Sequence, residues 1–239
     1  MYDLEKEAIS KGILSDIEFP RLVSYPRTGS HWFRILVEKY TGSPSYFRSF
    51  YTPNPSHVWG FHIHNRQADT PDKTEGIIEG LKKVIYLYRN PIDTIFSLLK
   101  YDNILPSNWN TEGIPTIRKK VIKFSKEYEK HLNFWLNNKH NAEKIIYVKY
   151  EDLKNNPKHT FKQILDFLQF DWDPERFDWV YKSVSKASTK SVTQHDYRVV
   201  NSEQLLTTNT IKKQKLKFKE LFESDIKLIF KEYYESKKI

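Results

Sequence analysis

Two segments of the chain combine basic and hydroxyl side chains in a way that could bind phosphate groups. The first, residues 24–32 (SYPRTGSHW), contains a single glycine and follows an apolar stretch. A strand-to-helix turn of this kind presents backbone N–H groups and a positive helix end to an anion, and Arg27, Thr28 and Ser30 add side-chain donors. An ordinary turn capped by hydroxyls is the structural alternative. The Walker A pattern G-x-x-x-x-G-K-[ST] does not occur in the chain, so a mononucleotide kinase or GTPase is poorly supported.

The second segment, residues 89–97 (RNPIDTIFS), begins at the end of the strongly β-forming stretch KVIYLY. Ligands of open α/β sheets collect beyond the carboxyl ends of strands, where Arg89 would lie, and Ser97 follows about two helical turns later. A guanidinium and a hydroxyl so placed can bind one terminal phosphate. An ion pair of Arg89, with Ser97 bonded to its own helix backbone, would explain the same residues. A third segment, residues 147–153 (YVKYEDL), is typical of a strand that runs into an acidic helix cap.

A pair of histidines, His62 and His64, lies in a further predicted strand. Residues two apart on a strand face the same side, so both imidazoles could serve one site. Such a pair can bind zinc, but no third ligand with recognisable spacing is present, and we expect no metal. The remaining alternatives are an acid–base role or two ordinary polar residues at the end of a strand.

The elements that must position these residues follow from the hydrophobic pattern, in which short apolar runs alternate with amphipathic stretches. Strands are predicted near 20–25, 58–64, 83–89 and 144–149. Helices are predicted after residue 30, from Asn90-Pro91, over 117–135, from Asn156-Pro157 and near 212–236. The sequence therefore predicts an α/β fold with a central parallel sheet, helices on both faces and a P-loop-like anion-binding turn.

Composition limits the classes of protein that fit. The 239 residues contain 39 Lys plus Arg, 30 Asp plus Glu and no Cys, which gives a formal net charge of +9. The absence of Cys excludes disulfides, Cys-ligated zinc and thiol catalysis. With no long apolar run and no apolar leader, we expect a cytoplasmic protein without a membrane span. We also expect one domain over 1–239, with a Ser/Thr/Asn-rich loop or lid at 185–210.

Taken in order, the three segments resemble the sulfotransferase family that uses 3′-phosphoadenosine 5′-phosphosulfate (PAPS), over about residues 20–170. SYPRTGSHW is similar to the family's 5′-phosphosulfate loop, Y-P-K-S-G-T-T-W. KVIYLYRNPIDTIFS is similar to its 3′-phosphate motif, V-I-Y-x-x-R-N-P-x-D-x-x-x-S, and YEDLKNNP to its Y-E-D-L-x-x-x-P segment. The resemblance implies a cytosolic-type sulfotransferase domain whose P-loop-like turn binds the phosphosulfate.

The resemblance also implies roles for individual residues. PAPS would be the donor and adenosine 3′,5′-bisphosphate (PAP) the product, without a metal. The donor would be bound by Arg27, Thr28, Gly29, Ser30 and His31 in the loop at its 5′ end, Trp32 and Tyr150 at the base, and Arg89 and Ser97 at the 3′-phosphate. Arg27 replaces the lysine of most small-molecule members, and tyrosylprotein sulfotransferases also have arginine there. Its fixed charge would stabilise the transferring group during catalysis.

The catalytic base follows from a further similarity. The family carries a base in a K-T-H segment before the 3′-phosphate strand, and His62-Ile63-His64 matches that spacing. His64 is therefore the expected base, with His62 as the reserve. The family's late R-K-G motif is not recognisable. Lys190, Arg198 or the Lys212–Lys215 cluster could replace it at the 3′-phosphate.

The expected function is in-line transfer of a sulfuryl group from PAPS to a hydroxyl or amine of a small-molecule or glycan acceptor. The alternatives are a nucleic-acid- or polyanion-binding protein that uses the basic surface, or a family member that binds nucleotide without catalysis. Aromatic loops at 46–61 and 101–114, the latter with Trp109, suit either an acceptor pocket or the core. The family's dimer motif has no clear copy, so no oligomeric state is predicted.

Overall fold

The computed structural model describes residues 20–42, 45–46, 60–64, 83–106, 109, 112–137, 142–184 and 208–235, and for 45–46 and 60–64 it describes the backbone alone. Most of the predicted loop or lid at 185–210 lies outside these residues. Its last part, from Thr208 onward, belongs to a helix instead. Among the helices within the described ranges, none is long and apolar enough to cross a membrane.

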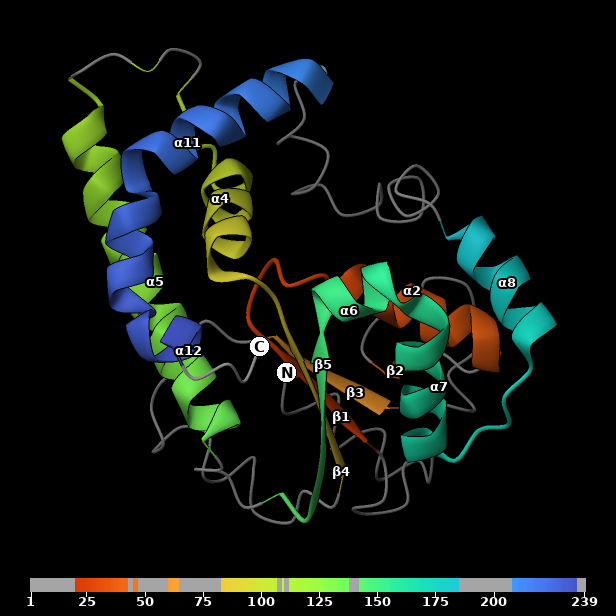
Figure 1. Cartoon of the computed structure of the whole chain (residues 1–239). Coiled ribbons are helices and arrows are strands. Elements are labelled where there is room, and N and C mark those ends of the chain that lie inside the picture. Colours follow the sequence, from red (N-terminus) through yellow and green to blue (C-terminus); the bar gives the residue numbers. More distant parts are fainter. Residues whose placement is uncertain are drawn as a thin grey trace.

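A parallel sheet lies at the centre of the molecule, with strand order β2-β3-β1-β4-β5 (Figure 1). The strands are β1 (Arg21–Ser24), β2 (Ser45–Tyr46), β3 (Gly60–His64), β4 (Lys83–Tyr88) and β5 (Lys144–Lys149). The four predicted strands and their parallel arrangement are therefore confirmed. The two-residue strand β2 was not predicted, because a segment so short carries no periodicity.

Strand β4 shows why the sheet is covered on both faces. Successive residues of a strand point to opposite sides, and Val84, Tyr86 and Tyr88 pack in one hydrophobic core while Ile85 and Leu87 pack in the other. All five are buried. A run without polar alternation is typical of a parallel strand between two layers of helices.

The helices form those two layers (Figure 1). One core is built with α4 (Pro91–Tyr101), α5 (Ile114–Leu136), α11 (Thr208–Ile229) and α12 (Lys231–Glu235). The other is built with α2 (Ser30–Thr41), α6 (Tyr150–Asn155), α7 (Pro157–Leu168) and α8 (Pro174–Ser183). The prediction of helices on both faces is confirmed.

Two helix predictions need correction. The last helix, predicted as continuous near 212–236, consists of α11 and α12 with a break at Phe230. Helix α8 was not predicted, although Asp173-Pro174 carries the same start signal as Asn90-Pro91. The Asp173 side chain accepts hydrogen bonds from the backbone N–H groups of Glu175 and Arg176, as an N-cap does.

The order of the strands brings the candidate site together. β1 and β4 are neighbours, and Ser24 pairs in register with Leu87. The turn that follows β1 and the residues that follow β4 consequently leave the sheet side by side at its carboxyl edge. This edge is where ligands of open α/β sheets bind.

Candidate anion-binding and active site

The turn between β1 and α2 has the backbone conformation of a tight anion loop. Arg27 and Gly29 are both left-handed, with φ of 70° and 102°. Thr28 closes the turn, since its backbone N–H and its Oγ1 both donate to the carbonyl of Tyr25, at 3.4 and 2.8 Å. Gly29 is the N-cap of α2 and has no side chain to bond the first N–H groups of the helix. The positive end of the helix therefore faces the loop without a capping side chain, an arrangement that favours an anion.

Glycine is required at position 29 for a second reason. A Cβ atom built there would lie 2.5 Å from Cδ2 of the Tyr150 ring. The Tyr150 ring at the start of α6 therefore packs directly on the backbone of the loop. This contact joins two segments that the sequence assigned to one nucleotide site.

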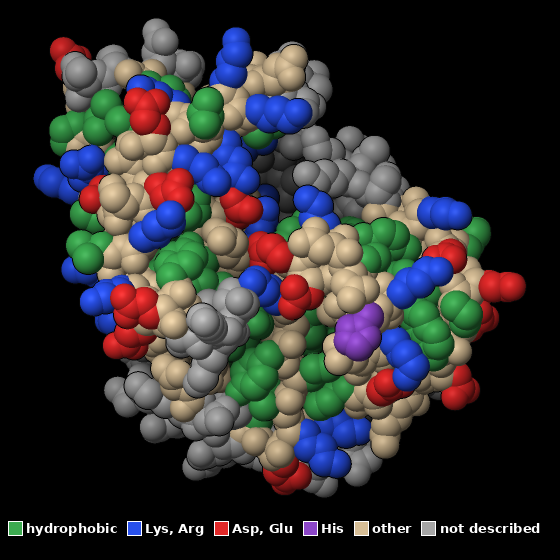
Figure 2. All heavy atoms as spheres, in the orientation of Figure 1, with side chains coloured by type: hydrophobic (Ala, Val, Ile, Leu, Met, Phe, Trp, Pro, Cys, Tyr) green, Lys and Arg blue, Asp and Glu red, His purple; other side chains and the backbone are tan. Residues whose placement is uncertain are grey.

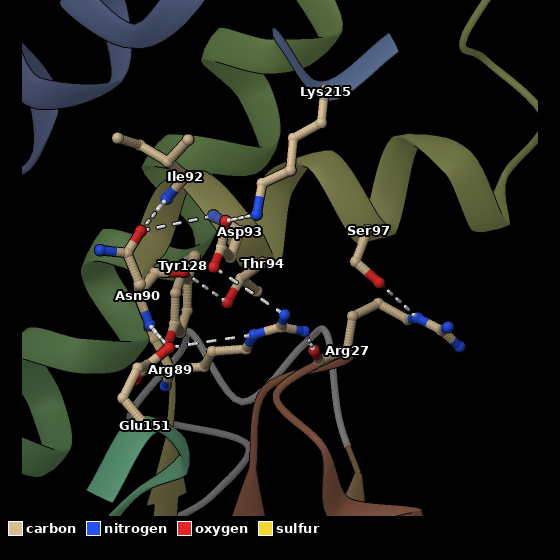
Figure 3. Close-up of polar contacts among 10 residues, drawn as sticks. All are labelled: Arg27, Arg89, Asn90, Ile92, Asp93, Thr94, Ser97, Tyr128, Glu151 and Lys215. Atoms are coloured by element: carbon tan, nitrogen blue, oxygen red, sulfur yellow. Dashed lines mark hydrogen bonds and ion pairs between the residues drawn. The ribbon is translucent and has the colours of Figure 1, made fainter. Parts of the chain in front are cut away.

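At the end of β4 the chain turns into α4, and specific side chains hold this turn (Figure 3). The hydroxyl of Tyr128 accepts a hydrogen bond from the Arg89 N–H at 3.0 Å and donates one to the Arg89 carbonyl at 2.7 Å. Glu151 Oε1 accepts from the Asn90 N–H at 3.1 Å. The predicted N-cap is confirmed, because Asn90 Oδ1 accepts from the backbone N–H of Ile92 at 3.0 Å.

The guanidinium of Arg89 lies against the anion loop. Its Nη1 donates to the carbonyl of Arg27 at 3.2 Å, and its Cζ lies 4.6 Å from the centre of the Tyr150 ring. Carboxylate oxygens of Asp93 and Glu151 are each 4.0 Å from guanidinium nitrogens. Arg89 is therefore pre-oriented, with two acidic groups that offset part of its charge.

Arg27 and Ser97 are in direct contact (Figure 3). Arg27 Nε donates to Ser97 Oγ at 3.2 Å, and the guanidinium stacks on Tyr101 with Cζ 4.7 Å from the ring centre. The two segments predicted to bind the two phosphate groups are joined through this bond. Tyr101 was not among the predicted site residues.

An aromatic corner adjoins the loop. The Trp32 ring lies edge-on to Tyr150 and Tyr181, with ring centres 5.7 and 6.0 Å apart. Trp32 Nε1 also donates to the carbonyl of Val184 at 3.2 Å. Tyr181 belongs to the unpredicted helix α8, so sequence reasoning missed it. His31 lies in the first turn of α2 and is partly buried.

The two histidines lie on β3, on the other side of β1 from β4. His64 is the last residue of β3 and pairs in register with Ser24, whereas His62 pairs with Leu22. The backbone of His64 is thus at the same carboxyl edge as the anion loop. The side chains of both histidines fall outside the described residues, and their roles stay predictions.

Lys215 of α11 reaches the same region. Its Nζ lies 2.6 Å from Oδ1 of Asp93, the carboxylate that is also near Arg89. Among the candidates for the missing late basic contact, Lys190 and Arg198 lie outside the described residues. In the described part of the chain, no group of three or more His, Asp or Glu side chains is placed to hold a metal ion.

Trp109 has a packing role. It is partly buried against the core formed with α4, α5 and α11, and its ring centre lies 6.3 Å from that of Phe222. The structure therefore assigns this residue to the core rather than to an acceptor pocket. In the other aromatic loop, predicted at 46–61, residues 47–59 lie outside the described residues.

A sulfotransferase domain model matches residues 73–238, and the chain belongs to this family. The matched residues include Arg89, Ser97 and Tyr150. The loop at 24–32 precedes the match, so its resemblance to the family rests on its own motif.

Curated relatives are sulfotransferases. The chain is 29% identical over 171 residues to human sulfotransferase 6B1, covering 62% of this chain and 54% of that protein. It is 25% identical over 186 residues to cytosolic sulfotransferase 15 of Arabidopsis thaliana, covering 64% and 52% respectively. The chain thus spans about half the length of these relatives.

Two solved structures share the fold. One is mouse sulfotransferase SULT7A1 complexed with PAP, with a TM-score of 0.57, 21% identity and coverage of 98% of this chain and 95% of that one. The other is retinol dehydratase in complex with androsterone and inactive cofactor PAP, with a TM-score of 0.51, 14% identity and coverage of 88% and 82%. These similarities support the α/β sulfotransferase fold.

Proposed function

We propose that this protein is a PAPS-dependent sulfotransferase that transfers a sulfuryl group to a hydroxyl or amine of a small-molecule or glycan acceptor. The observation that carries the proposal is the contact between Arg89 and the carbonyl of Arg27. It places the basic residue at the end of β4 directly against the glycine loop at the end of β1. Two anion-binding elements so close together suit a nucleotide with phosphate groups at both its 3′ and 5′ positions.

The donor is assigned to the residues that meet at this edge. The 5′ end is assigned to the loop of Arg27, Thr28, Gly29, Ser30 and His31, where backbone N–H groups and hydroxyls can bind phosphate and sulfate oxygens. The adenine is assigned to the corner of Trp32 and Tyr150, and the 3′-phosphate to Arg89 and Ser97. Two structures of similar fold contain PAP, which supports this choice of nucleotide.

A second cation, Lys215, is assigned to the 3′-phosphate beside Arg89. Lys215 is assigned the place of the family's late basic motif, because its ion pair with Asp93 holds it next to Arg89. A phosphate with two negative charges would compete with Asp93 for both cations. In this proposal Arg89 and Lys215 are held in place by Asp93, and both exchange this carboxylate for the 3′-phosphate when the nucleotide binds.

The transfer itself requires two contributions from the chain, stabilisation of charge and removal of a proton. The acceptor oxygen or nitrogen attacks sulfur, the bond from sulfur to the 5′-phosphate oxygen breaks, and PAP leaves with the electron pair. Arg27, which stays protonated at all relevant pH values, stabilises the charge on the transferring and leaving oxygens. His64, at the carboxyl end of β3, takes the proton of the acceptor.

The distribution of charge favours a compact nucleotide site over general binding of polyanions. On the face shown in Figure 2, Lys and Arg side chains are interspersed with Asp and Glu. Several basic side chains of the described residues are paired within their own helix, among them Lys162 with Asp166 and Lys227 with Glu223. Paired cations contribute little to a continuous basic surface.

The test is binding followed by turnover. We expect PAP to raise the melting temperature of the protein more than AMP or ATP at equal concentration, and labelled PAPS to label one member of an acceptor panel. Equal effects of the three nucleotides, with strongly salt-dependent binding of nucleic acids, would favour the polyanion-binding alternative. Selective PAP binding without any transfer would indicate a non-catalytic family member.

A further inference from the structure

One buried hydroxyl holds the backbone of Arg89 on both sides. Tyr128 OH accepts from the Arg89 N–H at 3.0 Å and donates to the Arg89 carbonyl at 2.7 Å (Figure 3). Arg89 is the first residue beyond β4, whose ladder to β5 ends with the pair Tyr88 and Lys149. Backbone groups at such a point need new partners. A single side chain supplies both of them here.

Tyr128 is itself held rigidly. It lies on α5, its exposed fraction is 0%, and its ring is edge-on to Phe230 with ring centres 5.7 Å apart. Burial raises the pKa of its hydroxyl well above the ordinary value for tyrosine. The hydroxyl therefore remains protonated at neutral pH and can donate to the Arg89 carbonyl while it accepts from the N–H.

The same ring also supports the anion loop. Tyr128 stacks on Tyr25, with ring centres 4.6 Å apart and an interplanar angle of 25°. The carbonyl of Tyr25 accepts both hydrogen bonds from Thr28 that close the loop. Tyr128 thus contacts the first residue of the loop with its ring and the backbone of Arg89 with its hydroxyl.

We infer that Tyr128 is a positioning residue of the nucleotide site, which sets the distance between Arg89 and the anion loop. The identity of the nucleotide rests on the proposed function, whereas the contacts of Tyr128 with Arg89 and Tyr25 do not depend on it. The position of the backbone at residue 89 determines where the Arg89 side chain starts. A shift of this backbone would lengthen the 3.2 Å hydrogen bond from the guanidinium to the Arg27 carbonyl. The next residue, Asn90, is held separately by Glu151, so the loss of the Tyr128 hydroxyl would act on Arg89.

The test compares two substitutions that each remove one buried hydroxyl and keep the ring. Tyr128→Phe removes the two bonds to Arg89, together with the hydrogen bond between the hydroxyl and the Thr94 side chain. Tyr86→Phe removes the bond between Tyr86 OH and His131 Nδ1, 2.9 Å long, in the same core. The melting temperature of each variant reports how much stability the protein loses with the hydroxyl. The ratio of the affinities for PAP and AMP reports whether Arg89 is still positioned, since only PAP carries the 3′-phosphate.

We expect Tyr128→Phe to reduce the preference for PAP over AMP by about tenfold, because a charge-assisted contact is weakened, and Tyr86→Phe to leave this ratio unchanged. A folded Tyr128→Phe variant with the wild-type ratio overturns the inference. A wild-type protein that does not prefer PAP overturns the proposed function instead.

Hydrogen exchange provides a readout that needs no nucleotide. We expect the Arg89 amide to exchange at least about tenfold faster in Tyr128→Phe than in Tyr86→Phe, because it loses its acceptor. The amides of 84–88, paired in the sheet, should exchange alike in the two variants. Equal exchange of the Arg89 amide would show that Tyr128 does not hold this backbone.

Discussion

Lys215 of α11 and Asp93 of α4 form an ion pair of 2.6 Å beside Arg89. The carboxylate of Asp93 therefore lies between two cations that are far apart in the sequence. This arrangement brings α11 to the proposed 3′-phosphate site and places a second basic group beside Arg89.

Lys215→Ala should weaken PAP binding by about fivefold, a modest effect because the side chain is partly exposed. AMP binding should stay unchanged. Lys217→Ala is the matched control, since Lys217 pairs with Glu220 on the same helix. Titration calorimetry with both nucleotides measures the difference. Equal affinities of the two variants for PAP would remove Lys215 from the site.

Arg89→Ala should weaken PAP binding by about 1.5–3 kcal/mol, because a hydrogen-bonded charge is lost from the 3′-phosphate. AMP lacks this phosphate and should bind almost as before. Arg118→Ala, which breaks an ion pair with Asp225, provides a control for the loss of one positive charge. An equal loss of affinity for PAP and AMP would show that Arg89 is structural.

Arg27→Ala should reduce turnover by about a hundredfold or more and donor affinity much less, because the guanidinium meets charge that develops during transfer. Arg27→Lys should retain appreciable activity, since the charge is kept. Steady-state kinetics with labelled PAPS separate the two effects. Near-normal turnover of the alanine variant would reduce the role of Arg27 to positioning.

Gly29→Ala and Gly42→Ala should differ in stability. Both glycines are left-handed, so each alanine carries a strain of about 1 kcal/mol. A Cβ added at position 42 would meet no heavy atom within 4 Å among the described residues other than its chain neighbours, whereas the new Cβ at position 29 meets the Tyr150 ring. We expect Gly29→Ala to lower the free energy of unfolding by at least about 2 kcal/mol. Denaturant unfolding measures both variants, and equal values would mean that the ring moves away at no cost.

His64→Ala should lose turnover by about 10²–10⁴-fold, the usual contribution of a general base, and should still bind PAP. His62→Ala is the matched comparison, two residues back on the same strand, and should remain active. An inactive His62→Ala with an active His64→Ala would assign the base to His62. Activity in both variants would place the base elsewhere.

The sequence alone was sufficient for most of the local structure. The β-branched and aromatic run at 83–88, the Asn90-Pro91 helix start and the apolar stripe over 117–135 all encode elements through short-range patterns, and the structure confirms them. Because the strands are parallel, their carboxyl ends had to share one edge. The approach of the loop at 24–32 to Arg89 then required only that β1 and β4 be neighbours.

The detailed contacts of the site depend on tertiary packing. Tyr128 lies on the helix predicted over 117–135, and the apolar periodicity of that helix carries no information about which group the hydroxyl of Tyr128 meets. The same holds for Arg27 with Ser97 and for Lys215 with Asp93. Side-chain contacts between residues far apart in sequence depend on how α4, α5 and α11 pack on the sheet, to within about one ångström, and no local pattern specifies that packing.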